Sequence, residues 1–260
     1  MLGSFTMGAR RLLLLLTLLG ISASSFLVFL QSPGAAAPTV ESGGSPLQLD
    51  GSLWPGKLPR REFIFVALTA TAKLERSETP TDTFLTKMVI DIDRNVRTGQ
   101  LALPSCTRDQ LERKGGRRRC HSAIVGEGSL TLAMGGGARE KSPLSIVNGG
   151  GSPGLAKLFL IASSGSLSTL PITEVRIARR RSLPFGSRAT VSVPGVGDEP
   201  LGVVGVQLRF PRLIDHSLRV GFFSARCPSG HLLASVPRYF LSDGSSYPGG
   251  GVPRTCTPRS

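Results

Sequence analysis

The chain has 260 residues, with 31 lysines and arginines against 17 aspartates and glutamates, and a formal net charge of +14. Such a balance favours acidic partners, namely envelope polymers, anionic lipid surfaces or nucleic acid. The chain holds one tryptophan and two tyrosines, which argues against a surface that recognises bases or sugars by stacking. We therefore expect no specific nucleic-acid partner.

Residues 1–36 have the layout of a secretory signal peptide. A basic start ends at Arg11, residues 12–30 are uncharged and mostly apolar, and small residues follow at 34–37. Cleavage after Ala36 is expected. The alternative is a retained anchor, because 19 residues of this kind nearly span a bilayer. We expect an exported protein, extracellular or at the cell surface, that meets a membrane only through this segment.

The rest of the chain divides by composition. Residues 37–60 are rich in Gly, Ser and Pro, which predicts a flexible linker. Residues 61–241 are expected to form one domain, because no internal repeat or shift in composition divides them. Residues 242–260 are again rich in Gly, Pro and Ser, and they are predicted to be a tail held by Cys256.

From Glu62 onward, apolar and polar residues alternate with the period of half-buried strands. The pattern predicts about nine strands, within 62–74, 84–93, 130–134, 155–164, 174–177, 189–193, 204–210, 218–222 and 232–236. The run at 155–164 is mostly apolar and does not alternate, so it is expected to be a fully buried strand. Residues 138–155 are predicted to be a loop. A capping box from Thr107 to Gln110 predicts one short helix, which Gly115 and Gly116 end.

This element order has no βαβ rhythm, so the fold class is mainly β. Short strands between Gly- and Pro-rich turns predict a single antiparallel β-sandwich or open barrel.

All four cysteines follow the predicted signal peptide, and they are Cys106, Cys120, Cys227 and Cys256. An even number in an exported chain predicts disulfides, and four cysteines allow three pairings. The local pairing of the first two and the last two is favoured, and each bond would contribute about 3 kcal/mol by closing a short loop. A four-cysteine metal site is the alternative, although neither pair has the CxxC spacing.

The turn containing Asp91, Asp93 and Asn95 begins like a Ca²⁺-binding loop, with oxygen ligands at alternate positions. The pattern then fails, because Val96 stands where such a loop needs glycine and Ala102 where it needs glutamate. These residues are weak metal candidates, and we expect no metal or cofactor. Both aspartates are predicted to lie on the solvent face of a strand.

Two basic runs are candidate anion-binding sites, because the arginine fork binds phosphates and carboxylates bidentately. The residues are Arg113, Lys114, Arg117, Arg118, Arg119, Arg179, Arg180 and Arg181. The two runs could form one patch that meets an anionic envelope polymer or lipid surface. Solvated charge clusters without a ligand are the alternative.

No catalytic residue is predicted. The sequence contains no H-E-x-x-H motif. The leading hypothesis is a non-enzymatic exported β domain that binds or decorates the cell envelope through a basic surface. A secreted hydrolase is the alternative, with a site assembled from distant residues around His216 or His231. A module that binds partners through exposed sheet edges is a third hypothesis.

Several short motifs recur in a known family. They are LPR at 58–60, VIDIDRN at 89–95, LPSC at 103–106, CxxAIVGxG at 120–128, SARCPSGHL at 224–232 and RTCT at 254–257. With them the chain resembles a family of uncharacterised exported β-rich proteins of Solirubrobacter-type actinobacteria. The family often has D-x-D-K-N-G at the acidic turn, where this chain has Arg94 and Val96. The resemblance implies an exported, disulfide-linked β domain and no activity.

Overall fold

The computed structural model describes most of the chain, namely residues 46–75, 83–98, 103–133, 138–152, 154–163, 172–193, 202–214 and 220–259. The predicted signal peptide, its apolar segment and His216 lie outside these ranges. Within them, no helix combines the length and the apolar character that crossing a membrane requires.

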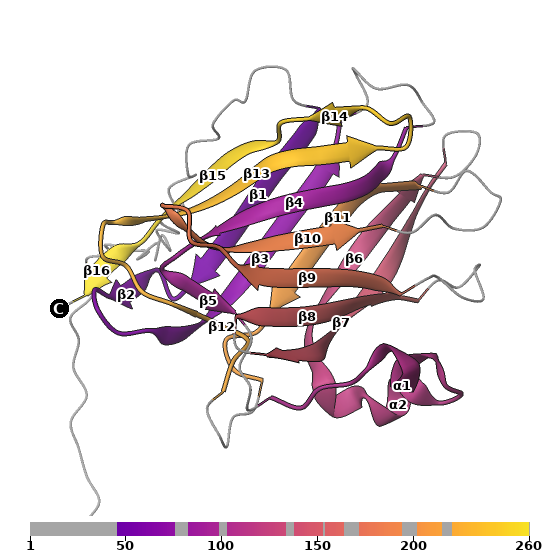
Figure 1. Cartoon of the computed structure of the whole chain (residues 1–260), viewed down its shortest axis with the longest axis horizontal. Helices are drawn as coiled ribbons and strands as arrows, with labels where there is room; N and C mark the ends of the chain where they lie inside the picture. Colours follow the sequence, from indigo (N-terminus) through magenta and orange to yellow (C-terminus); the bar gives the residue numbers. More distant parts are fainter. Residues whose placement is uncertain are drawn as a thin grey trace, which may run out of the picture. The chain divides into compact units, whose positions relative to one another are not determined.

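Seven antiparallel strands form a closed barrel (Figure 1). Their order around the ring is β4 (Leu85–Asp93), β10 (Phe185–Ser192), β9 (Thr173–Arg179), β8 (Leu155–Ala162), β7 (Arg139–Ser152), β6 (Ile124–Ala133) and β11 (Gly202–Phe210). The ring closes where Val203 of β11 pairs with Leu85 of β4. The mainly β prediction is confirmed, but the sandwich is wrong, and the barrel is closed where an open one was predicted. The barrel is closed because distant strands pair, which periodicity alone does not specify.

Beyond this one pair, β4 and β11 separate, and further strands extend from each of them. On the β11 side follow β3 (Ile64–Leu74) and β1 (Leu47–Trp54). On the β4 side follow β13 (His231–Leu241), β14 (Ser246–Tyr247) and β15 (Gly250–Thr255). β1 and β15 are neighbours, and in the described part of the chain they share no strand pairing. An ion pair between Asp50 and Arg254 joins them. We call this line of contact the seam.

Four short strands complete the β structure. β12 (Phe223–Ala225) pairs with β3 on one side and with β5 (Val96–Thr98) on the other. β2 (Lys57–Pro59) pairs in parallel with β16 (Thr257–Arg259). The described residues thus contain sixteen strands, more than the predicted nine, because many are too short to show a period.

Three predictions of irregular structure are wrong. Residues 47–54 and 57–59 of the predicted linker are β1 and β2, and the predicted tail contains β14, β15 and β16. Most of the predicted loop 138–155 is β7. In each case glycines and serines obscure the alternation, as in β1, where Leu49, Gly51 and Leu53 share the inward face and the residues between them are polar.

The short helix is confirmed as α1 (Arg108–Glu112), with its capping box formed. The Thr107 hydroxyl accepts from the Gln110 backbone N–H at 3.3 Å, and the Gln110 side chain accepts from the Thr107 N–H at 2.8 Å. A second helix, α2 (Gly116–Arg119), and a 3₁₀ turn, η1 (His121–Ala123), follow. Neither was predicted. We call residues 106–123 the helical lobe.

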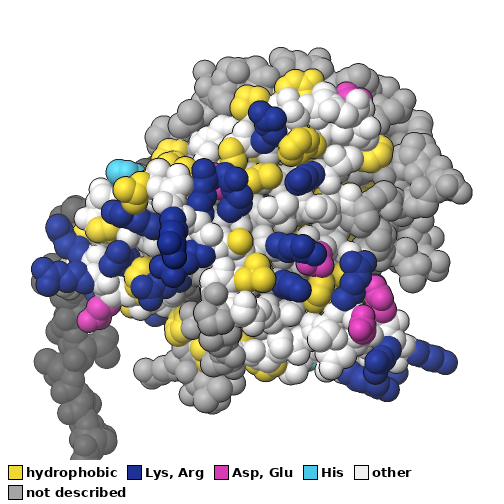
Figure 2. Space-filling view, viewed as in Figure 1, with side chains coloured by type: hydrophobic (Ala, Val, Ile, Leu, Met, Phe, Trp, Pro, Cys, Tyr) yellow, Lys and Arg dark blue, Asp and Glu magenta, His cyan; other side chains and the backbone are white. Residues whose placement is uncertain are grey.

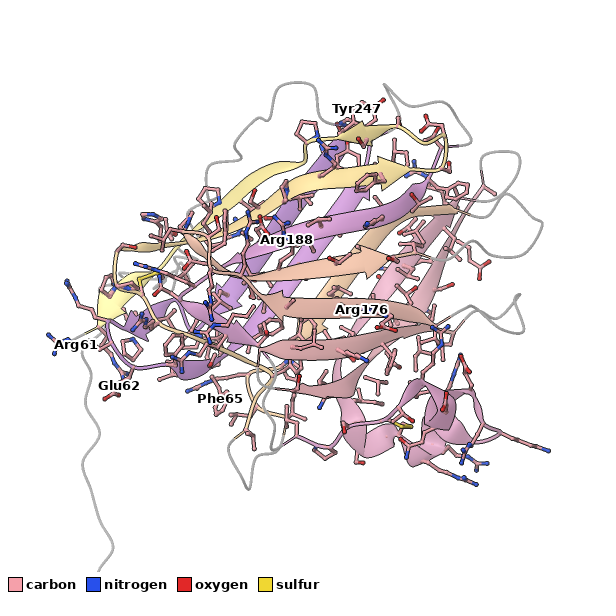
Figure 3. All side chains as sticks on the ribbon, in the orientation of Figure 1. Arg61, Glu62, Phe65, Arg176, Arg188 and Tyr247 are labelled. Atoms are coloured by element: carbon pink, nitrogen blue, oxygen red, sulfur yellow. A yellow bond between two sulfur atoms is a disulfide. The ribbon has the colours of Figure 1, made fainter. Side chains whose placement is uncertain are left out.

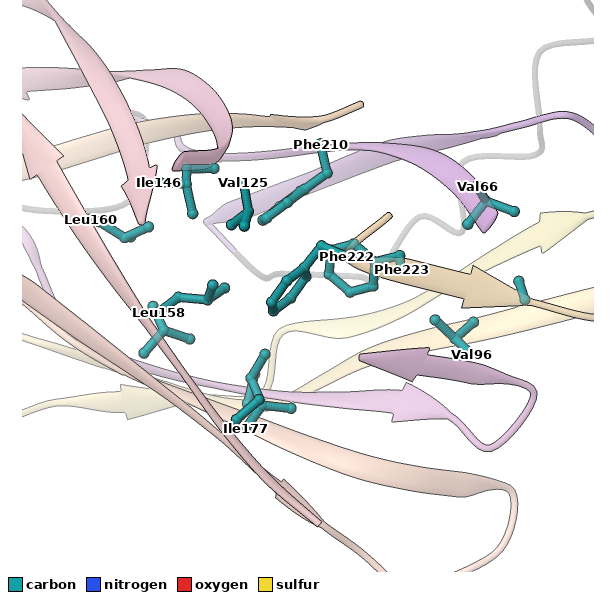
Figure 4. Packing of buried hydrophobic residues seen from close by; sticks show 14 of the residues in the cluster. Val66, Val96, Val125, Ile146, Leu158, Leu160, Ile177, Phe210, Phe222 and Phe223 are labelled. Atoms are coloured by element: carbon teal, nitrogen blue, oxygen red, sulfur yellow. The ribbon is translucent and has the colours of Figure 1, made fainter. Parts of the chain in front are cut away.

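The core lies inside the barrel, where Val66, Ile146 and Phe222 are fully buried. Phe222 and Phe223 pack against Phe210 near one end of the barrel (Figure 4). A smaller apolar cluster, which includes Met88 and Tyr239, lies around Leu85. Burial of these aromatic rings removes a large apolar area from water.

β8 is buried on both faces, which explains its nearly continuous apolar run. Leu158 and Leu160 belong to the barrel core. Phe159 and Ile161 point outward and pack beneath Leu111 of the helical lobe. The prediction of a fully buried strand is therefore confirmed, although the covering element is a lobe of two short helices and not a second sheet.

Both predicted disulfides are present. Cys106–Cys120 joins Cα atoms 5.7 Å apart across the helical lobe. Cys227–Cys256 joins Cα atoms 6.0 Å apart and links the segment after β12 to the segment between β15 and β16. Disulfides persist in oxidising compartments, so the pairing indicates an oxidising environment for the folded chain.

Replacing both Cys227 and Cys256 with Ser should lower the free energy of unfolding by about 2–4 kcal/mol, because the unfolded chain regains the entropy of an open loop. Urea unfolding of the variant and of the unreduced protein would measure the difference. The variant should remain folded, since β15 and β16 keep their strand pairings. An unchanged free energy of unfolding would mean that those pairings alone hold the C-terminal segment.

Candidate anion-binding groove

Five arginines line a groove of about 720 Å³. They are Arg94 in the β4–β5 turn, Arg97 on β5, Arg179 at the end of β9, and Arg180 and Arg181 after it. None of the described lining residues is acidic. In the view of Figure 2, Lys and Arg side chains gather on this end of the barrel. We call this feature the arginine groove.

Backbone hydrogen bonds bring these distant segments together. The Arg94 N–H donates to the Pro184 carbonyl at 3.1 Å, which ties the β4–β5 turn to the β9–β10 connection. The Arg179 N–H donates to Gly154 at 2.7 Å, and the Arg180 N–H donates to Gly186 at 2.8 Å. Arg94, Arg179 and Arg180 thus project from backbone that is hydrogen-bonded to a neighbouring segment.

The opposite wall of the groove comes from an irregular part of β7. The pairing of β7 with β8 shifts register between Asn148 and Gly151, and Gly150 adopts a φ of +75°. The buried Asn148 amide donates to the Pro104 carbonyl at 2.9 Å and accepts from the Gly150 N–H at 3.1 Å. This places Ser105 beside the glycines, where a Cβ on Gly150 would lie 3.3 Å from the serine side chain. The Gly-rich stretch predicted as loop is therefore groove wall.

The buried carboxylate of Asp91 holds Arg180, one of the arginines that line the groove. Asp91 is 2% exposed and accepts from Arg188 at 2.7 and 2.9 Å, and it forms a second ion pair with Arg180. Figure 3 labels Arg188 on β10, beside β4. Burial alone would raise the pKa of Asp91, but hydrogen bonds and charge from Arg188 and Arg180 outweigh it and lower the pKa below 3.8.

The predicted solvent exposure of the acidic turn is wrong. Asp93 and Asn95 are 5% and 6% exposed. Asp93 accepts from the Asn95 N–H at 2.8 Å and from the Leu233 N–H at 3.0 Å. The Asn95 side-chain oxygen accepts from Arg226 at 3.0 Å. The strand face was assigned correctly, but Arg180 and Arg188 cover Asp91, and Asp93 is bound by backbone N–H groups that include one from β13.

The weak metal candidates therefore serve as hydrogen-bond acceptors within the fold. Asp91 holds two arginines, while Asp93 and Asn95 hold the β4–β5 turn. Among the described residues, no group of three or more His, Cys, Asp or Glu side chains is placed to hold a metal ion.

Four arginines of the groove keep their charge available. In the described part of the chain, Arg94, Arg97, Arg179 and Arg181 are exposed and form no ion pair. The Arg97 guanidinium lies 3.7 Å from the centre of the Phe63 ring, a cation–π contact that orients it. The hydroxyl of Ser187, another lining residue, is buried and finds no hydrogen-bond partner within the described ranges. The groove thus offers donors for phosphate or carboxylate oxygens.

The predicted basic patch is divided. Arg179, Arg180 and Arg181 line the groove, whereas the other predicted residues lie exposed on the helical lobe and do not line it, namely Arg113, Lys114, Arg117, Arg118 and Arg119. The groove instead gains Arg94 and Arg97, which sequence analysis did not select. Both arginines follow directly after the predicted strand 84–93. The sequence does not indicate that this strand pairs with β10, which brings the two arginines to the β9–β10 connection.

An apolar cavity of about 250 Å³ lies inside the barrel. Its walls come from both the ring and the flanking strands, and Val96 and Ile177 line it as well as the arginine groove. Neither His121 nor His231 lines the groove or the cavity.

Fold and site together define a disulfide-linked β-barrel with an apolar cavity and a cationic groove. Comparison of the chain with protein-family models, with curated proteins and with solved structures finds no match. The chemistry of the groove is therefore interpreted from its own geometry.

Replacing Asp91 with Asn should destabilise the protein by about 1–3 kcal/mol at pH 7. Loss of the carboxylate leaves Arg180 and Arg188 uncompensated, and their 30% and 40% exposure keeps the cost below that of a fully buried pair. Because folding lowers the pKa of Asp91, its contribution is complete above about pH 4 and is lost as the pH falls through the folded pKa.

Urea unfolding at pH 7, 5 and 3 would test this. The difference between the natural protein and the variant should be equal at pH 7 and 5 and smaller at pH 3. The control is Glu127→Gln, because that side chain is 73% exposed and its replacement should cost less than about 0.5 kcal/mol. A difference that stays the same at pH 3 would contradict the role given to the carboxylate.

Proposed function

We propose that this protein is an exported, non-enzymatic binding domain of the cell envelope, and that it holds anionic groups of an envelope polymer or lipid surface in the arginine groove. The observation that supports this proposal is the composition of the groove, where five arginines converge and none of the described lining residues is acidic. Like charges repel one another, so such convergence costs free energy until an anion is bound.

The groove is suited to an extended or branched anion more than to a single small ion. Its volume of about 720 Å³ lies within the range of about 300–1,000 Å³ that holds ligands of drug size. Arg94 and Arg181 come from different segments, so one ligand can be held by several guanidinium groups. The two disulfides indicate an oxidising environment, which is compatible with the proposed site of action.

The test compares two triple variants that remove the same charge. The groove variant carries Arg94→Gln, Arg179→Gln and Arg181→Gln, which spare Arg180 with its ion pair and Arg97 with its ring contact. The lobe variant carries Arg113→Gln, Lys114→Gln and Arg118→Gln, all on exposed side chains. Inorganic polyphosphate represents an anionic polymer, and vesicles of phosphatidylglycerol represent an anionic lipid surface.

The groove variant should bind one of these probes at least about tenfold more weakly, since hydrogen bonds to charged groups are lost. The lobe variant should change affinity by less than about threefold at 0.15 M salt, where distant charges are screened. Equal losses in both variants would attribute binding to net charge and overturn the role of the groove. Weaker binding at higher salt is expected throughout.

A further inference from the structure

Arg254 is a charged residue on the inward face of the flanking strand β15. It lies directly opposite Leu232 in the pairing of β15 with β13, and residues opposite each other in an antiparallel pair share a face. Leu232 is 4% exposed and belongs to the core. Arg254 accordingly lines the apolar cavity together with Ala234 and Val252.

The guanidinium of Arg254 is only partly satisfied. One terminal nitrogen donates to Asp50 across the seam, while the Nε atom is buried and has no hydrogen-bond partner among the described residues. A buried donor without an acceptor costs free energy, and native proteins rarely leave one so. An acceptor that arrives from the cavity side would remove this cost.

Asp50 does not compete strongly for this arginine. It lies on the outward face of β1, opposite Thr71, and its side chain is 78% exposed. Water can therefore solvate the carboxylate when the guanidinium turns toward the cavity. Because the Asp50 carboxylate is mostly solvated, its ion pair with Arg254 contributes little to stability, so the exchange of one carboxylate for another is inexpensive at this position.

The remaining surface of the cavity is mostly apolar and leaves space. Ile90, Val191 and Val206 point inward from three ring strands yet are only partly buried. Apolar side chains that border empty interior space gain from being covered by another apolar group. The volume of about 250 Å³ is slightly below the usual range for drug-sized ligands, which limits an occupant to one short or medium chain.

We propose that the cavity binds a single-chain carboxylate amphiphile, with its alkyl chain among the apolar walls and its carboxylate on Arg254 at the seam. This site is separate from the arginine groove and does not rest on the function proposed for it. The arginine supplies paired N–H donors that match a carboxylate, and the walls supply the contacts for the chain.

The experiment compares decanoate with decanol, which has the same chain length and no charge. Calorimetric titration of the full folded chain should show tighter binding of decanoate. In Arg254→Met, which keeps an apolar stem, decanoate should bind about tenfold to a hundredfold more weakly, while decanol is unchanged. The matched control is Arg238→Met, an exposed arginine on β13 that does not line the cavity.

A second variant tests the cavity. Ala234→Phe fills the space beside Arg254 and should abolish binding of both ligands, and Val191→Phe does the same from the ring strand β10. Thermal unfolding identifies which of the two is folded and used. The groove triple variant should bind decanoate normally, which separates this proposal from the previous one.

Three results would overturn the proposal. The natural protein could bind neither ligand, it could bind both equally, or Arg254→Met could leave decanoate binding unchanged. Any of these would be decisive whether or not the arginine groove binds polyphosphate or vesicles.

Discussion

The pairing of Val203 with Leu85 determines how the β structure is organised. At this point the ring of seven strands is closed, and beyond it β4 and β11 follow different partners. A barrel of this size normally has just enough interior space for its own side chains. Because the flanking strands continue from the two separating strands, the interior becomes wider than the ring alone would allow. The cavity is a consequence of this divergence.

On the outside of the barrel, a few buried carboxylates determine where the arginines lie. The chain has far more cations than anions, and the fold uses its few buried carboxylates to position arginines. Asp91 holds Arg188 and Arg180, and the Asp93–Asn95 turn receives Arg226. Arg94, Arg97, Arg179 and Arg181, which have no such partners among the described residues, border the groove. The acidic turn is therefore part of the basic site, because it fixes the backbone from which the free guanidinium groups extend.

Local features were predictable from the sequence. Alternation located β3 and β4, a capping box located α1, and spacing located both disulfides. Ring closure was not predictable, because it depends on the pairing of β4 with β11. The same limit applies to the site. Arg179 to Arg181 were selected as a run, but Arg94 and Arg97 join them only through the contact between the β4–β5 turn and the β9–β10 connection. Arg254 carried no signal, since its inward direction follows from register.

The seam also bears on aggregation. Strands that lie at the edge of a sheet can add strands from other molecules, because their backbone donors and acceptors are unpaired. In β15, Pro253 has no N–H to offer, and Arg254 beside it carries a charge. β1 places Asp50 on the other side of the seam. Proline and charge are the devices that keep natural sheet edges from pairing with one another. The seam, at which the described residues of β1 and β15 meet without strand pairing, is thus also protected against growth into larger assemblies.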